Sequence, residues 1–231
     1  MPTVGLVGGL GPESTIDYYR RILAAWEREE PSSAPSIVID SLDVRRGLNL
    51  VERDRAGLVE YLLGSIRRLA GAGVDFVAMT ANTPHIVFDA LAERSPLPLL
   101  SIVQTCAAEA RRLGLTRPAL LGTRFTMEAT FYPDVFAKNR MTIVVPDAND
   151  RAWVHARYIG ELLIGEFRDD TRREFIDLIG RLRDDQRADS VILGGTELPL
   201  LLQSTTVAGL PVLDTTALHV AAIVARLRCQ P

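Results

Sequence analysis

The chain has 231 residues, of which 47% are hydrophobic and 24% are charged, and its formal net charge is −3. This composition is that of an ordinary globular protein with enough apolar side chains for a substantial core. A nucleic-acid-binding protein would carry a basic stripe, and the charge balance gives no sign of one. No segment reaches the roughly 18 unbroken apolar residues of a membrane span. We therefore expect neither a nucleic acid nor a membrane as a partner.

The first residues and the cysteines bear on location. Met1-Pro2 runs straight into an apolar segment, without the basic region and the cleavable apolar stretch of a signal peptide. Cys106 and Cys229 are the only cysteines, too few for a disulfide framework. These features predict a cytoplasmic protein.

Short β-branched runs alternate with longer amphipathic stretches along the chain. Continuous apolar strands separated by helices of this length are typical of parallel sheets covered on both faces. The predicted class is therefore α/β. The expected strands are residues 3–7, 36–42, 74–79, 118–121, 141–145, 190–193 and 211–213, and the main expected helices are residues 14–30, 54–72, 102–113, 151–167 and 171–185.

Two pairs of turns repeat at the same spacing. The strand ending at Gly8 resembles the one ending at Gly122, and the strand before Ala81 resembles the one before Gly195; the members of each pair are 114 residues apart. Two matching offsets indicate a duplication, so we expect two pseudo-symmetric lobes, residues 1–100 with 210–231 and residues 101–209. Because ligands bind beyond the carboxyl ends of parallel strands, we expect the four turns to meet at one cleft between the lobes.

The first turn, Gly8-Gly-Leu-Gly-Pro12, comes before an expected helix. Glycines let the backbone approach a ligand, and N–H groups at a helix start attract anions. The turn lacks the third glycine of a dinucleotide-binding G-x-G-x-x-G and the Gly-Lys-Ser/Thr of a P-loop. An anion site at Gly8 and Gly9 and a purely structural tight turn are both compatible with this pattern.

The other three turns carry small polar side chains, namely Asn82, Thr83, Thr123, Thr196 and Glu197. Such groups suit a carboxylate or an amino acid better than a base or a sugar. His85 follows Pro84, which is tolerated in a first helical turn. This histidine is either a general base or a structural residue at a helix start.

The opening segment VGLVGGLGPESTIDYYRRI resembles the aspartate/glutamate racemase family, in its aspartate racemase branch. TANTPHIVFDAL, LLGTRFTMEATFY and LGGTELPLL resemble three further blocks of that family in the same order, and the similarity extends from Thr3 to about Leu218. The resemblance implies two pseudo-symmetric α/β lobes, a homodimer, and catalysis without pyridoxal phosphate or metal. In this family two cysteines on opposite faces of the substrate exchange its α-proton, one as thiolate base and the other as thiol acid.

The family's two cysteine positions fall at Ala81 and Gly195 in this chain. Neither residue carries an ionisable atom, so the acid and the base of two-base racemisation are both missing. Cys106 and Cys229 lie outside the motifs, and we assign neither of them a catalytic role.

Three functions are compatible with these replacements. The first is racemase-type isomerisation of an amino acid, with another group in place of the thiols, such as Thr80, Thr83, His85, Thr196 or Glu197. The second is another cofactor-independent reaction on a small carboxylate, such as a lyase, decarboxylase or isomerase step. The third is binding of an amino acid without catalysis. For all three the predicted substrate-binding set, without cofactor or metal, is Gly8, Gly9, Asn82, Thr83, Thr123, Thr196, Glu197 and Arg45.

Overall fold

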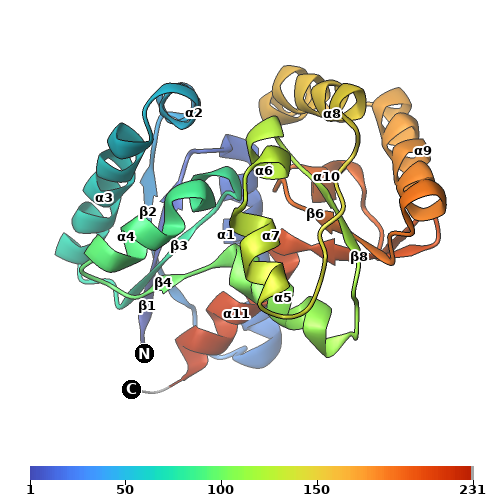
Figure 1. Ribbon diagram of the computed structural model, residues 1–231. Coiled ribbons are helices and arrows are strands. Elements are labelled where there is room, and N and C mark those ends of the chain that lie inside the picture. Colours follow the sequence, from blue (N-terminus) through green and yellow to red (C-terminus); the bar gives the residue numbers. More distant parts are fainter. Residues whose placement is uncertain (230–231) are drawn as a thin grey trace. The chain divides into compact units, whose positions relative to one another are not determined.

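The computed structural model describes residues 1–229 as an α/β protein (Figure 1). The chain divides into two compact units, one formed by Met1–Ile102 with the chain from His219 onward, the other by Val103–Leu218. Each unit contains a four-stranded, largely parallel sheet with helices packed on it. The predicted fold class is confirmed.

The sheet of the first unit has the order β2-β1-β3-β4, and all its neighbouring strands are parallel. Its strands are β1 (Thr3–Gly8), β2 (Ser36–Ser41), β3 (Phe76–Met79) and β4 (Leu99–Leu100). β1 and β3 lie in the middle and are almost wholly buried. This burial explains why they read as continuous apolar runs rather than as alternating ones.

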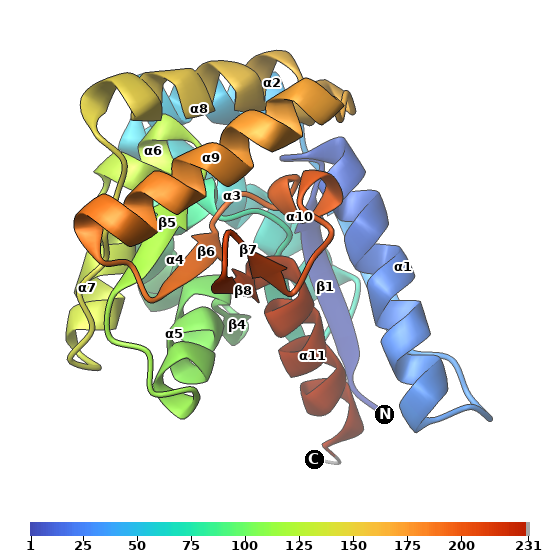
Figure 2. The ribbon, with the colours of Figure 1, turned by 90° about the vertical axis from the view of Figure 1, so that its right-hand side faces the viewer.

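Helices cover both faces of this sheet. α1 (Pro12–Glu29) and α11 (Thr215–Arg228) lie alongside β1 in Figure 2, and Tyr18 and Val224 from these helices share one buried cluster with Leu6. α3 (Arg55–Gly71) packs on the other face, because a Cβ on Gly5 would lie 3.2 Å from Leu69 Cδ1. The unit also contains α2 (Val44–Arg53), the 3-10 helix η1 (Thr83–Val87) and α4 (Phe88–Arg94).

The sheet of the second unit has the order β5-β6-β8-β7. β5 (Pro118–Leu121), β6 (Ser190–Leu193) and β8 (Leu210–Asp214) are parallel, and the short β7 (Thr206–Val207) is antiparallel to β8. Its core combines β5 and β6 with α8 (Ala148–Gly160) and α9 (Asp169–Gln186), drawn in yellow and orange in Figure 1. The other helices are α5 (Ile102–Arg112), α6 (Arg124–Glu128), α7 (Phe131–Ala137), η2 (Leu162–Ile164) and α10 (Leu198–Leu201).

The two sheets repeat one strand pairing at the spacing of 114 residues seen in the sequence. Val4 of β1 pairs with Phe76 of β3, and Pro118 of β5 pairs with Ser190 of β6. The pairing then continues in step to the ends of the strands in both sheets. Identical register in two separate sheets supports the inferred duplication.

An aspartate joins the same two strands at their beginning in each unit. The N–H of Thr3 donates to Asp75 Oδ2 at 2.7 Å, and the N–H of Arg117 donates to Asp189 Oδ2 at 2.8 Å. Both pairs of residues are again 114 positions apart. The repeat therefore includes a side-chain contact as well as the strand pattern.

Two predicted elements are wrong in detail. Residues 141–145 do not form a β-strand. Val144 makes only an isolated parallel bridge to Ala119 of β5. Pro146 ends this segment, and proline cannot donate to a strand ladder. The helix predicted over residues 151–167 stops at Gly160, where Glu161 leaves the helical conformation, and Gly165 at a φ of +81° ends the following η2.

The boundary near the end of the chain also differs from the expected one. The sequence placed residues 210–218 in the first lobe. In the structure, Leu213 of β8 pairs with Ile192 of β6, so this strand completes the second sheet. The change of unit falls within α11, between Leu218 and His219.

Candidate functional site

Buried hydroxyl groups join the carboxyl ends of β1 and β3 in the first unit. The N–H of Gly9 donates to Thr15 Oγ1 at 2.9 Å, and this oxygen lies 3.1 Å from Thr80 Oγ1. Ser14 Oγ donates to the carbonyl oxygen of Thr80 at 3.0 Å. These bonds fix the start of α1 against the turn that carries Ala81.

The glycines of the first turn are required by close packing. A Cβ on Gly8 would lie 2.6 Å from Thr15 Cγ2, and a Cβ on Gly9 would lie 2.5 Å from the nitrogen of Leu42. Gly9 also has a φ of +78°, a region that favours glycine. The tight turn thus accounts for both glycines, and their role in binding an anion stays a prediction.

His85 is enclosed by backbone groups on both sides of its ring. Nε2 accepts from the N–H of Ile102 at 3.3 Å, so Nδ1 carries the proton and donates to the carbonyl of Ala81 at 3.2 Å. Burial, reinforced by His219, lowers the pKa of His85 to about 3. The imidazole is therefore neutral and ties the Ala81 turn to the start of α5. These contacts favour the structural alternative over a general base.

The remaining predicted residues of the first unit differ in exposure. Ala81 and Asn82 are buried beyond the end of β3, and Thr83 beside them is half-buried. Arg45 is exposed on α2, where its N–H donates to Asp43 Oδ1 at 2.8 Å and so helps to cap that helix. The structure brings Ala81, Asn82 and Thr83 together in one turn and places Arg45 on a separate helix.

Thr123 has a clear structural part in the second unit. Its Oγ1 accepts from the N–H of Thr126 at 3.2 Å and caps α6. The neighbouring Gly122 comes so close to the next turn that a Cβ on it would lie 2.7 Å from the carbonyl oxygen of Gly194. At the ends of β5 and β6 the two backbones therefore lie in direct contact, without a side chain between them.

Beyond β6, a phenol and a carboxylate are buried beside Gly195. The hydroxyl of Tyr158 on α8 donates to Glu197 Oε2, and Thr196 Oγ1 donates to the same oxygen at 3.2 Å. Tyr158 is 5% exposed and Glu197 is 2% exposed. A Cβ on Gly195 would lie 2.8 Å from both Cζ and Oη of Tyr158. The ring therefore fills the space that a side chain at position 195 would enter.

The phenol of Tyr158 keeps its proton. Burial, together with the charge of Glu197 and the hydrogen bond to it, raises the pKa of Tyr158 well above its ordinary value. The phenol is therefore neutral and donates a hydrogen bond to Glu197.

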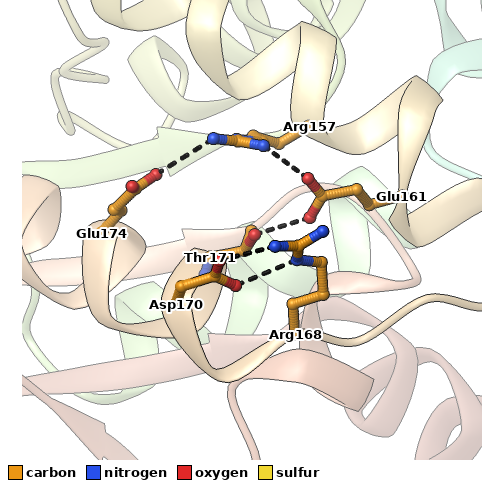
Figure 3. Close-up of polar contacts among 6 residues, drawn as sticks. All are labelled: Arg157, Glu161, Arg168, Asp170, Thr171 and Glu174. Carbon is orange, nitrogen blue, oxygen red and sulfur yellow. Dashed lines mark hydrogen bonds and ion pairs between the residues drawn. The ribbon is translucent and has the colours of Figure 1, made fainter.

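An ion-pair network fixes the last turn of α8, which carries Tyr158, to the start of α9 (Figure 3). Glu161 accepts from Arg157 Nη1 and from Thr171 Oγ1, both at 2.6 Å. Arg157 also approaches Glu174 Oε2 at 3.6 Å. Burial tends to raise the pKa of Glu161, but the donors of Thr171 and Arg157 outweigh it and the pKa is lowered. We expect this network to restrain Tyr158.

The sequence analysis missed Tyr158, Ser14 and Thr15. Tyr158 could have been found as a buried position, since Val154, Tyr158 and Leu162 recur every four residues and all three are buried. Its contact with the Gly195 turn had no signal in the sequence. Cys106 is fully buried, and burial raises its pKa far above the ordinary thiol value, so it is inert.

Residues 1–229 contain neither a membrane-spanning helix nor a cluster of metal-ligating side chains. No helix in this part of the chain is long and apolar enough to cross a membrane. Within the same residues, no group of three or more His, Cys, Asp or Glu side chains is arranged to hold a metal ion.

The fold and these turns define a protein of duplicated α/β units that carries small polar residues at its strand ends. The chain matches the family model of the Asp/Glu/hydantoin racemases over residues 7–223. It belongs to this family.

Individual relatives agree with this assignment. The chain is 23% identical to the broad specificity amino-acid racemase RacX of Bacillus subtilis (strain 168), with 93% of each chain covered. Its fold matches a candidate Asp/Glu racemase from Yersinia pestis with a TM-score of 0.87 and 31% identity, covering 98% of this chain and 99% of the other. An aspartate racemase homologue from Pyrococcus horikoshii OT3 matches with a TM-score of 0.82, 29% identity and the same coverage.

Proposed function

We propose that this protein is a racemase-type enzyme, independent of pyridoxal phosphate and metal, that acts on a small amino acid or a related carboxylate. The observation that carries the proposal is the family match over residues 7–223. The broad amino-acid specificity of RacX and the aspartate racemase homologue among the relatives support an amino acid as substrate.

The proposed substrate-binding groups are those at the strand ends of each unit. Their hydroxyl, amide and backbone N–H groups suit the carboxylate of an amino acid. Arg45 is the proposed partner of a second, side-chain carboxylate. The proposed set is Gly8, Gly9, Asn82, Thr83, Thr123, Thr196, Glu197 and Arg45.

Incubating the purified protein with single enantiomers of amino acids in deuterium oxide tests the proposal. We expect aspartate, glutamate or a neutral amino acid to gain deuterium at the α-carbon, which proton NMR detects. We expect the same amino acid to be inverted, which chiral chromatography detects. Complete absence of exchange and inversion over the full set of amino acids, in protein shown to be folded, would rule the proposal out.

A second candidate function is a lyase or decarboxylase step on a small carboxylate, or binding without turnover. The observation in its favour is that Ala81 and Gly195 carry no acid or base. The same incubation distinguishes the candidates, because a lyase or decarboxylase gives a new product, whereas a binding protein gives a calorimetric signal and no chemistry.

We also propose a homodimer that works in the cytoplasm. The dimer follows from the family resemblance, and the two free cysteines suit a reducing compartment. Multi-angle light scattering tests the dimer: a particle of 25.4 kDa at micromolar concentration would exclude it.

A further inference from the structure

The Gly195 turn is the place in the second unit where a phenol, a carboxylate and a hydroxyl converge. Tyr158 reaches the turn from α8, while Thr196 and Glu197 follow Gly195 directly in the chain. The turn lies just beyond the carboxyl end of β6, and this is the edge of a parallel sheet at which ligands bind.

Gly195 leaves room for the phenol at this edge. Its backbone does not require glycine, since it is absent from the residues with positive φ. Glycine is required by the ring of Tyr158, which would lie 2.8 Å, at Cζ and at Oη, from any Cβ added there. An ionisable oxygen therefore stands at the position where the resemblance places a thiol.

We propose that Tyr158 and Glu197 form a proton-transfer pair that takes the place of the missing thiol at position 195. The inference rests on the proposed function, because it concerns the α-proton of that substrate. Tyr158 is the proton-transfer residue, and Glu197 is a positioning residue that acts through it. The network of Arg157, Glu161 and Thr171 holds the helix from which the phenol extends.

The pair can take a proton from the substrate and return one without a change in its total number of protons. In the resting pair Tyr158 is a neutral phenol hydrogen-bonded to the Glu197 carboxylate. When the α-proton moves to the phenol oxygen, the phenol's own proton passes to Glu197, and the C–H electron pair stays on the substrate as the enediolate of its carboxylate. Reversal returns a proton to the carbon and restores the Glu197 carboxylate. The pair thus stores one proton. Strict reversal returns to the carbon the proton that it lost, so deuterium enters the substrate only when the proton on the phenol oxygen exchanges with solvent before the reversal.

The pair can act from one side of a substrate only, because Ala81, the other position to which the resemblance assigns a thiol, carries no acid or base. Deuterium should therefore enter with retention of configuration faster than the enantiomer is inverted. Exchange that is faster than inversion distinguishes the Tyr158–Glu197 pair from a two-base mechanism. In a two-base mechanism each exchange event at the carbon is coupled to inversion.

The decisive experiment compares Tyr158→Phe with Tyr132→Phe. Tyr132 is a second fully buried tyrosine of the same unit, packed against Phe131 and Phe136. Tyr158→Phe keeps the ring against Gly195 and removes only the hydroxyl. We expect α-proton exchange to fall roughly 10²–10⁴-fold in Tyr158→Phe, the usual contribution of a positioned acid–base group. Tyr132→Phe should leave the exchange rate close to that of the wild type, because Tyr132 is not part of the proposed pair.

Glu197→Gln provides a second, independent variant. Glutamine can still accept the phenol's hydrogen bond but cannot take up its proton. Exchange at saturating amino acid, where weaker binding is overcome, should fall to a similar degree, and both variants are measured at a temperature where circular dichroism shows them folded. A role of Glu197 in binding alone would instead raise the half-saturating concentration and leave the rate at saturation unchanged.

Two outcomes would overturn the inference in different ways. Exchange at the wild-type rate in Tyr158→Phe or in Glu197→Gln would overturn the pair and leave the proposed function intact. A wild-type protein that exchanges no α-proton of any amino acid would overturn the proposed function and the inference together.

Discussion

The ring of Tyr158 occupies the space that a side chain on Gly195 would enter. The two residues come from different elements, the helix α8 and the turn after β6. A Cβ on Gly195 would lie 2.8 Å from the phenol oxygen, well inside van der Waals contact, and closer still to the ring edge. The glycine and the tyrosine are therefore coupled, and a change at one position constrains the other.

Gly195→Ala should destabilise the protein for this reason. Overpacking a well-filled core usually costs about 1–3 kcal/mol, and the free energy of unfolding in urea is the measurement. Gly160→Ala is the matched control, because nothing lies within 4 Å of a Cβ added at this helical glycine. We expect the control to be neutral or more stable by up to about 1 kcal/mol. Equal stabilities of the two variants would contradict the coupling.

Thr171→Val should loosen the end of α8. The change keeps the shape of the side chain but removes the hydroxyl that donates to Glu161 Oε2. Leaving a buried carboxylate with one donor fewer costs on the order of 1–3 kcal/mol. Asp169→Ala is the comparison, because its ion pair with Arg172 is exposed and such pairs contribute at most about 1 kcal/mol. Hydrogen exchange should quicken at residues 157–161 in Thr171→Val only; unchanged protection there would exclude the proposed restraint.

Acid should weaken the fold through its two buried histidines before the carboxylates titrate. Burial lowers the pKa of His85 to about 3 and that of His219 to about 4, from 6.5. Between pH 6.5 and 5 the unfolded chain binds protons that the native protein does not. The free energy of unfolding therefore decreases as the pH is lowered through this range. The slope is up to about 1.4 kcal/mol per pH unit for each histidine.

His219→Asn tests this assignment. His219 Nε2 donates to the Leu100 carbonyl at 3.2 Å, so Nδ1 of the neutral ring accepts from the Tyr18 hydroxyl at 3.0 Å. The variant should be less stable at pH 7, because these bonds are disturbed, yet its stability should fall only about half as steeply between pH 6.5 and 5. Urea titrations at several pH values give the slopes. A slope as steep as that of the wild type would show that His219 does not titrate in this window.

The sequence predicted the α/β class and the strand ends well because both depend on local patterns. Apolar runs such as residues 190–193 became buried strands, and the 114-residue spacing reappeared as identical register in the two sheets. The segment 141–145 was wrongly predicted as a strand because its apolar pattern says nothing about how many partners it pairs with. It makes a single bridge.

The contents of the candidate site were harder to predict. Ala81 and Gly195 could be identified because each lies within a recognisable segment of the chain. Tyr158 could not, because its contact with the Gly195 turn joins distant parts of the sequence and depends on how α8 packs. His85 likewise had two readings until its ring nitrogens were seen to contact the Ala81 carbonyl and the Ile102 N–H.

Restoring cysteines at both positions should restore two-base racemisation only if Tyr158 is also made smaller. A thiol has a pKa much nearer neutrality than a hydroxyl, and N–H groups at a helix start lower it further. In the double variant Ala81→Cys/Gly195→Cys, however, the new Cβ at position 195 meets the Tyr158 ring. We therefore expect the double variant to fold poorly and to racemise little.

Adding Tyr158→Val to this double variant relieves the contact and leaves space for the thiol. We expect the triple variant to invert aspartate or glutamate faster than the wild type, with deuterium uptake and inversion occurring at similar rates. Ala81→Cys/Tyr158→Val, which lacks the second thiol, is the control and should not invert, because inversion requires a proton removed on one face and delivered on the other. Chiral chromatography measures the inversion. A folded triple variant that binds aspartate without exchanging its α-proton would mean that the strand-end turns are shaped for a different substrate.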